Sequence, residues 1–218
     1  MEEPTSAPPR DQTPYWDRVA RAKTFSHEPD DDVLARFFPR DEPLLDLGCG
    51  YGRLTSRLAA AGYAAVGADR SCGMLARARE EHPRLRLVRL PDGPLPFASR
   101  RFGGVLLFSV LTCIPGAADQ VALLDEVARI LRPGGHLYVS DCLLQPDARN
   151  RERYDAGRER YGEEGLFDHE EGVTFSHLTT DRIARIDQRF ERASYVERDV
   201  VTMNGNRVRA FQLVGTAR

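Results

Sequence analysis

The sequence predicts an α/β protein with a mainly parallel β-sheet, and two observations carry this prediction. First, apolar segments of strand length alternate with helical segments between about residues 43 and 142. Near-continuous apolar strands are typical of a parallel sheet that helices cover on both faces. Second, residues 44–53 form an apolar strand that runs into a glycine-rich loop and then into a helix. This unit is typical of α/β folds that bind nucleotide-like ligands.

The individual elements follow from local pattern. Strands are expected near residues 43–48, 64–69, 85–90, 104–109 and 136–142, and helices near 53–61, 72–82 and 118–131. The last of these helices carries an apolar stripe and ends before a Pro-Gly-Gly turn at 133–135, because proline and glycine do not continue a helix. Residues 15–38 have helical character with a break near Pro29, and residues 1–14, polar and proline-rich, are expected to be a disordered leader.

The chain changes character after the last core strand. Residues 145–177 are charged and are expected to form an irregular insertion on the substrate side. A helix is expected to start at Thr180-Asp181, with Ile183, Ile186 and Phe190 on its buried face. Two strands near 193–203 and 207–216 flank Asn204-Gly205-Asn206, which predicts a hairpin because Asn-Gly favours a tight turn.

Composition limits the classes of function. The 218 residues suit one domain, and no apolar run reaches membrane-spanning length. The net charge of −2 gives no basic footprint for nucleic acid. The leader has no apolar signal core, so a cytoplasmic protein is expected. Four scattered cysteines without a C-x-x-C pair predict reduced thiols and no metal site.

The glycine-rich loop favours a particular ligand chemistry. Its pattern places Asp46 ahead of glycines 48, 50 and 52, whereas a dinucleotide loop reads G-x-G-x-x-G. A carboxylate there suits an ammonium group better than a phosphate. S-adenosylmethionine carries an α-amino group and a ribose but no phosphate, so it fits better than NAD. Asp69, at the end of the next strand, has the spacing at which an acid accepts hydrogen bonds from a ribose diol.

Four motifs in order make the chain resemble the class I S-adenosylmethionine-dependent methyltransferases of the small-molecule type. Residues 46–52 are the loop, 91–97 resemble the family's D-A-x-x-L-P-F stretch, 102–111 its fourth strand, and 131–140 its L-R/K-P-G-G turn into the fifth strand. The resemblance implies one Rossmann-like domain over residues 15–218 with an N-terminal helical lid. It also implies a seven-stranded sheet of order 3-2-1-4-5-7-6, with strand 7 antiparallel.

The resemblance also implies a set of cofactor-binding residues. The methionine part would lie over Asp46, Gly48, Cys49, Gly50 and Gly52, and the ribose beside Asp69 and Arg70. Met74, Asp92 and Gly93 would contact the adenine, and Phe108 and Ser109 would lie near the methyl group. Tyr15, Lys23 (the only lysine) and Phe25 would belong to the lid. The alternatives are that the first helix only packs Trp16 and Val19 on the core, and that Met74 is core.

Methyl transfer is an in-line displacement, so alignment can supply about 7–11 kcal/mol without a catalytic dyad. A base is needed only where the nucleophile carries a proton. The chain has Gly103 where relatives often have aspartate, and Thr112-Cys113 where some have two histidines. The preferred base is therefore His177, whose ordinary pKa suits proton removal near neutral pH. Further candidates are Asp141, Tyr161, Tyr154 and His169.

The interpretation favoured by these observations is a methyltransferase that acts on an O, N, S or C atom of a small molecule, as a monomer or homodimer. No nucleic-acid or membrane partner is expected. One alternative is a protein that binds S-adenosylmethionine or S-adenosylhomocysteine in a regulatory or non-methylating role. Another is a protein or RNA methyltransferase. Five arginines between residues 149 and 160 could attract an acidic acceptor, but neighbouring acids nearly balance them, which favours a solvated helix face.

Overall fold

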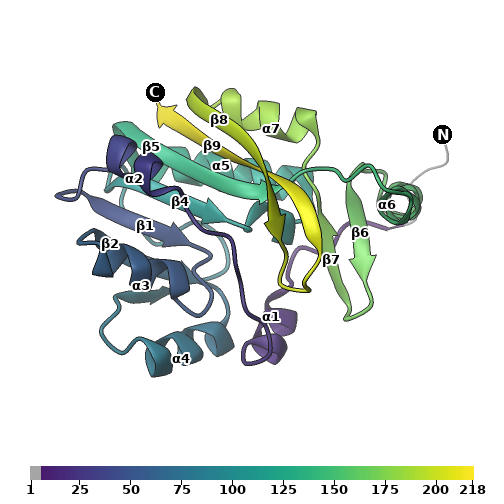
Figure 1. Ribbon diagram of the computed structural model, residues 1–218, viewed down its shortest axis with the longest axis horizontal. Helices are drawn as coiled ribbons and strands as arrows, with labels where there is room; N and C mark the ends of the chain where they lie inside the picture. The colour runs from purple at the N-terminus through teal and green to yellow at the C-terminus, as the bar shows by residue number, and fades with distance from the viewer. Residues whose placement is uncertain (1–5) are drawn as a thin grey trace.

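The computed structural model describes residues 6–218, which form a seven-stranded mixed sheet and a separate two-stranded sheet (Figure 1). The large sheet has the order β3-β2-β1-β4-β5-β9-β8. Its strands are β1 (Pro43–Leu47), β2 (Ala64–Asp69), β3 (Leu87–Arg89), β4 (Phe102–Phe108), β5 (Leu131–Cys142), β8 (Phe190–Val201) and β9 (Arg207–Ala217). The first five strands are parallel, and β9 is antiparallel to both β5 and β8. This topology confirms the predicted sheet.

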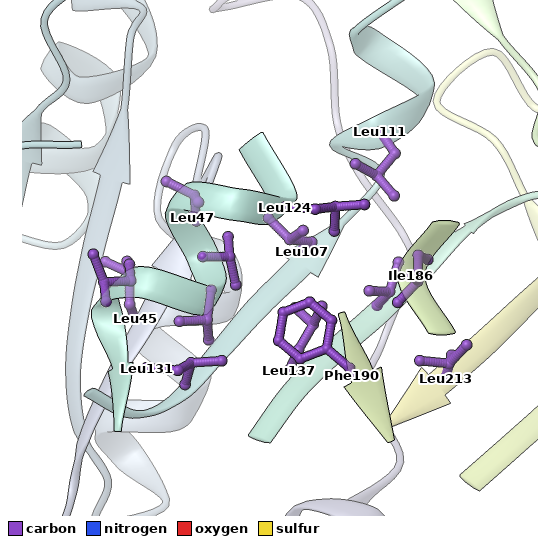
Figure 2. Close-up of a cluster of buried hydrophobic side chains, with 14 of the residues drawn as sticks. Leu45, Leu47, Leu107, Leu111, Leu124, Leu131, Leu137, Ile186, Phe190 and Leu213 are labelled. Carbon is purple, nitrogen blue, oxygen red and sulfur yellow. The ribbon is translucent and has the colours of Figure 1, made fainter. Parts of the chain in front are cut away.

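Helices cover both faces of the large sheet. The helices are α1 (Thr13–Val19), α2 (Asp31–Phe37), α3 (Arg53–Ala60), α4 (Cys72–Glu81), α5 (Ala117–Ile130), α6 (Ala148–Tyr161) and α7 (Thr180–Asp187). Leu44 packs with residues of α2 and α3, whereas Leu45 and Leu47 pack with residues of α5 and α7. Successive strand residues point to opposite faces, so this division follows directly from the apolar pattern of β1. Figure 2 shows part of the α5 and α7 side.

The parallel strands bring three sequence motifs to one edge of the sheet. Leu47, the last residue of β1, lies beside Ala68 of β2, and Asp46 lies beside Leu106 of β4. The backbone amides of Gly48 and Cys49 donate to the carbonyl oxygen of Ala68, at 2.7 and 3.0 Å. The glycine loop, Asp69 and the end of β4 are therefore neighbours, at the position where open α/β sheets bind ligands.

The segment 145–177 is more regular than predicted. It contains α6 and a two-stranded antiparallel sheet of β6 (Leu166–His169) and β7 (Val173–Ser176). The buried residues of α6 are Asn150, Tyr154, Gly157 and Tyr161. Their spacing is helical, but they are not the aliphatic residues by which a buried helix face is usually detected. The prediction of an irregular insertion was wrong for this reason.

The N-terminal region also differs from the prediction. Residues 20–30 between α1 and α2 are not helical, so the break is longer than expected at Pro29. The side-chain amide of Gln12 donates to the carbonyl oxygens of Cys113 and Thr174, at 2.9 and 2.8 Å. The folded part thus begins before Tyr15, and the part of the predicted leader at residues 1–5 lies outside the described residues. Within residues 6–218, no helix is both long enough and apolar enough to cross a bilayer.

At the end of α7 the structure corrects one further assignment. The helix ends at Asp187, and Phe190 is the first residue of β8 rather than part of the buried helix face. Ile183 and Ile186 are buried as expected, and Thr179 caps the helix by accepting from the backbone amide of Arg182 at 3.2 Å. The β8–β9 hairpin that follows confirms the prediction from Asn204-Gly205-Asn206.

Candidate active site

A cavity of about 1110 Å³ lies at the carboxyl edge of the large sheet. One part of its wall comes from the glycine loop, the ends of β2 and β4, and the N-terminal segment around residues 10–27. The other part comes from α6, β6, β7 and the β8–β9 turn. In Figure 1, α6, β6 and β7 lie on one side of the β8–β9 hairpin, and β1, β2 and β4 lie on the other. The cavity slightly exceeds the range of about 300–1,000 Å³ that is common for small-molecule sites.

The glycine loop lines the cavity with backbone rather than side chains. Gly48 and Gly50 have φ angles of +76° and +53°, which L-residues with side chains rarely adopt. A Cβ atom at position 48 would lie 2.6 Å from Cγ2 of Val110, and one at position 50 would lie 3.1 Å from the Phe25 ring. The packing of Val110 and Phe25 against these positions therefore requires glycine, and the loop contributes its backbone to the cavity wall.

Two carboxylates flank the loop. Asp69 accepts from the backbone amide of Gly50 through Oδ2 and from that of Ser71 through Oδ1, both at 2.8 Å. Asp46 is 2 % exposed and accepts from the hydroxyl of Thr55 at 2.5 Å. Burial raises the pKa of Asp69 and raises the pKa of Asp46 to about 6. Both carboxylates therefore lie where a cationic or hydroxyl-bearing ligand would relieve the cost of burying their charge.

These residues fit S-adenosylmethionine on chemical grounds. A carboxylate has about four acceptor sites, and the two backbone amides use two of those on Asp69. Acceptor capacity is thus left for a ribose diol. The ammonium of the methionine part would favour the charged form of Asp46, which burial alone disfavours. The glycines beside it leave room for the chain that joins these two groups.

Most of the predicted cofactor-binding residues reach the cavity wall. The residues that do so are Phe25, Asp46, Gly48, Cys49, Gly50, Asp69, Arg70, Met74, Asp92, Gly93, Phe108 and Ser109. Arg70 forms an ion pair with Asp92. Met74 is 2 % exposed and also packs with Ala20 and Tyr51, so it serves the core as well as the cavity wall. The structure thus brings together residues from five separate segments.

Tyr15, Lys23 and Gly52 are not among the residues that line the cavity. The hydroxyl of Tyr15 and the ammonium of Lys23 bind the two carboxylate oxygens of Glu171, at 2.6 and 2.9 Å. Lys23 also donates to the side chain of Asn204 at 2.9 Å, in the β8–β9 turn. These contacts tie the N-terminal segment to the β6–β7 and β8–β9 hairpins. Gly52 has a φ angle of +79° and starts α3.

The three predicted catalytic residues have different surroundings. His177 lines the cavity, and its Nδ1 lies 2.5 Å from the hydroxyl oxygen of Tyr154. Burial lowers the pKa of His177 to about 3, helped by the charge of Arg153. The ordinary imidazole pKa that led to its choice is therefore not retained, and the ring is neutral near pH 7.

Asp141 and Tyr161 are buried but do not line the cavity. Asp141 accepts from the backbone amides of Cys142 at 3.0 Å and Thr112 at 3.2 Å, and burial raises its pKa to about 7. The hydroxyl of Tyr161 donates to Asp168 at 2.7 Å. These contacts hold neighbouring backbone and side chains in place. Within residues 6–218, no cluster of histidine, cysteine and acidic side chains is arranged to hold a metal ion.

One pair in the cavity wall had no signal in the sequence. Ser109 has a φ angle of +58°, which is uncommon outside glycine, and its hydroxyl lies 3.0 Å from Nδ1 of His27. His27 is 7 % exposed, and burial lowers its pKa to about 4. The two residues are 82 positions apart and meet because residues 20–30 fold back across the sheet edge. No local sequence pattern around His27 predicts this contact.

The chain has a Rossmann-like fold with a cavity at the carboxyl edge of its sheet, and part of the chain is similar to known methyltransferases. Residues 45–139 match the family model described as a methyltransferase domain. Demethylmenaquinone methyltransferase of Tropheryma whipplei (strain Twist) is 35% identical over 102 residues, which are 46% of this chain and 41% of that protein. The chain thus matches about two fifths of the length of this curated relative.

Solved structures show the same fold over more of the chain. The S-adenosylmethionine-dependent methyltransferase from Methanosarcina mazei covers 85% of this chain and 96% of its own, with a TM-score of 0.79 and 22% identity. The N-methyltransferase NodS from Bradyrhizobium japonicum, in complex with S-adenosyl-L-homocysteine, covers 80% and 77%, with a TM-score of 0.57 and 15% identity. Residues 45–139 of the chain are thus similar to a methyltransferase domain, and the chain as a whole shares the fold of these S-adenosylmethionine-dependent enzymes.

Replacing Gly48 by alanine is expected to weaken S-adenosylhomocysteine binding at least about tenfold, because the new Cβ meets Val110 and strains the loop. Gly172→Ala is the matched control, since its φ angle is +80° and nothing lies within 4 Å of its Cβ. Both variants carry the left-handed penalty of about 1–2 kcal/mol. Calorimetric titration of each variant with S-adenosylhomocysteine distinguishes the effect at the site from this shared penalty. Equal affinity in both variants would contradict a close approach of the ligand at Gly48.

Proposed function

We propose that this protein transfers a methyl group from S-adenosylmethionine to a small-molecule acceptor. The observation that supports this most directly is that one cavity joins the loop of Gly48 and Gly50 to the chamber lined by α6, β6 and β7. A cofactor on the first part and an acceptor in the second would share one cavity. Proximity and alignment of that kind can supply most of the rate increase in a displacement reaction.

Each part of the cofactor has proposed partners in this chain. Asp46 and the loop backbone would bind the methionine part, Asp69 the ribose, and Met74 and Asp92 the adenine. When bound, S-adenosylmethionine supplies an electrophilic methyl group on a sulfonium. The contacts of Tyr15 and Lys23 with Glu171 would hold the N-terminal segment over the site and exclude water.

The proposed role of His177 follows from its neutral state. A pKa of about 3 makes it a weak base near pH 7, since efficient proton transfer needs a pKa close to the working pH. Its Nδ1 contacts Tyr154, which leaves Nε2 as the ring nitrogen for an acceptor. We therefore assign His177 mainly to orienting the acceptor, and the chemistry to alignment. Asp141 and Tyr161 would support the wall from behind.

The test is a titration followed by a turnover assay on the full chain. Micromolar binding of S-adenosylmethionine and S-adenosylhomocysteine is expected by calorimetry. Incubation of S-adenosylmethionine with a small-molecule extract should then give S-adenosylhomocysteine and a product heavier by one methylene unit in mass spectrometry. Binding without such a product would favour a regulatory role, and methyl label found only in protein or RNA would favour the macromolecular alternative. Absence of binding would overturn the proposal.

A further inference from the structure

The far chamber of the cavity is charged in a way that the sequence alone does not show. Three arginines contribute to its wall, namely Arg149, Arg153 and Arg207, against one acid, Asp147. Both carboxylate oxygens of Asp147 are already used by Asn150, at 3.1 Å to the backbone amide and 2.6 Å to the side-chain amide. Arg207 lies 4.0 Å from Asp199, so the excess of positive charge in the chamber comes from Arg149 and Arg153.

Arg153 differs from the other arginines of α6 in its surroundings. Arg158 and Arg160 form ion pairs with Glu164 and Asp168, at 3.1 and 2.5 Å. Among residues 6–218, Arg153 has no acid within ion-pair distance, and its Nε is buried without a hydrogen-bond partner. A buried donor without a partner is costly. Arg153 thus brings into the cavity wall a positive charge that no acidic side chain of the described residues pairs with.

The guanidinium of Arg153 packs over an aromatic ring. Its Cζ lies 3.6 Å from the ring centroid of Phe167, and burial lowers the pKa of the guanidinium. The rings of Phe167 and Phe175 are 5.9 Å apart, and both line the chamber together with Met203. A flat apolar body would pack against these side chains, while its charged group reached Arg153.

We infer that the acceptor is an aromatic carboxylic acid whose carboxylate binds Arg153 and whose ring packs against Phe167 and Phe175. This inference rests on the proposed function, because it names the substrate class of the same site. A guanidinium presents paired N–H donors in a fork that matches the two oxygens of a carboxylate. Whether residues 145–177 attract an acidic acceptor thus depends on Arg153, and not on the balance of charges along that segment.

The test compares matched acid and amide probes on the full chain saturated with S-adenosylhomocysteine, and also without it. The probes are 4-hydroxybenzoate with 4-hydroxybenzamide, and indole-3-acetate with indole-3-acetamide. At least one acid is expected to bind about tenfold or more tightly than its amide. Arg153→Gln should abolish this preference and Arg153→Lys should retain part of it, because lysine keeps the charge but not the fork.

Arg158→Gln is the control, since Arg158 lies on the same helix, 54% exposed, and pairs with Glu164. It should keep the full preference for the acid. S-adenosylhomocysteine affinity should stay within about twofold in all variants.

No preference for either acid in the original chain, or a preference that survives in Arg153→Gln, would overturn the inference. A loss of S-adenosylhomocysteine binding in Arg153→Gln would assign the residue to the cofactor and overturn it too. Failure of the original chain to bind S-adenosylhomocysteine would instead overturn the proposed function, and the titrations without it would still decide on Arg153.

Discussion

Asp69→Ala is expected to weaken S-adenosylhomocysteine binding about tenfold or more, a loss of at least about 1.4 kcal/mol. Two causes act together. The substitution removes the proposed acceptor for the ribose diol, and it removes the partner of the Gly50 and Ser71 backbone amides. Hydrogen bonds to a charged group contribute about 1.5–3 kcal/mol each, so even one lost contact would reach the expected size. Calorimetric titration of the purified variant measures this loss.

A matched control is Asp125→Ala, because Asp125 is 58% exposed, pairs with Arg189 and does not line the cavity. Its S-adenosylhomocysteine affinity should remain within about twofold of the original chain. Thermal unfolding of both variants shows whether Asp69→Ala is still folded. A folded Asp69→Ala variant with unchanged affinity would remove Asp69 from the cofactor site and would weaken the proposed function with it.

Phe190→Ala is expected to destabilise the protein by about 3–5 kcal/mol, the usual cost of deleting a buried aromatic ring. Phe190 is 1 % exposed at the start of β8, and Figure 2 shows its ring close to Leu137, with Ile186 and Leu213 nearby. A Cβ at position 215 of β9 would lie 2.6 Å from the Cβ of Phe190, so the two strands meet closely there. Urea unfolding should show a lower midpoint with an unchanged slope.

The control for Phe190 is Val196→Ala on the same strand, because Val196 is 41% exposed. This change is expected to alter the free energy of unfolding by no more than about 0.5 kcal/mol. A loss below about 1 kcal/mol in Phe190→Ala would mean that the cluster collapses into the vacated space. In that case the contact between Phe190 and β9 would contribute much less to the fold than its burial indicates.

The sheet and the cofactor loop could be predicted because their signals are local. Leu45 and Leu47 define one face of β1, and the apolar stripe of the helix that begins at residue 117 needs only its own spacing. The positions of the loop glycines and Asp69 follow from backbone geometry and strand order, both of which the sequence motifs indicate. The predicted cofactor-binding residues that line the cavity all come from segments whose structure the sequence predicted correctly, apart from the N-terminal segment around Phe25.

The acceptor side could not be predicted in the same way. The buried face of α6 consists of Asn150, Tyr154, Gly157 and Tyr161, so its helical period has no aliphatic signal. Lys23 was expected at the cofactor but binds Glu171, which is 148 positions away. Such partners are decided by how the N-terminal segment and the two hairpins pack, and no short sequence window contains that information.

The sequence by itself determined the core strands and the glycine-rich loop, because periodicity and backbone freedom are properties of short segments, and its resemblance to methyltransferases implied the order of the strands. Only the tertiary structure decided which ionisable groups face the cavity and in which state. Arg153 enters the wall while Arg158 pairs with Glu164, and His177 stays neutral because burial lowers its pKa to about 3. Burial and the positions of counter-charges arise from contacts between distant segments, and these exist only in the folded chain.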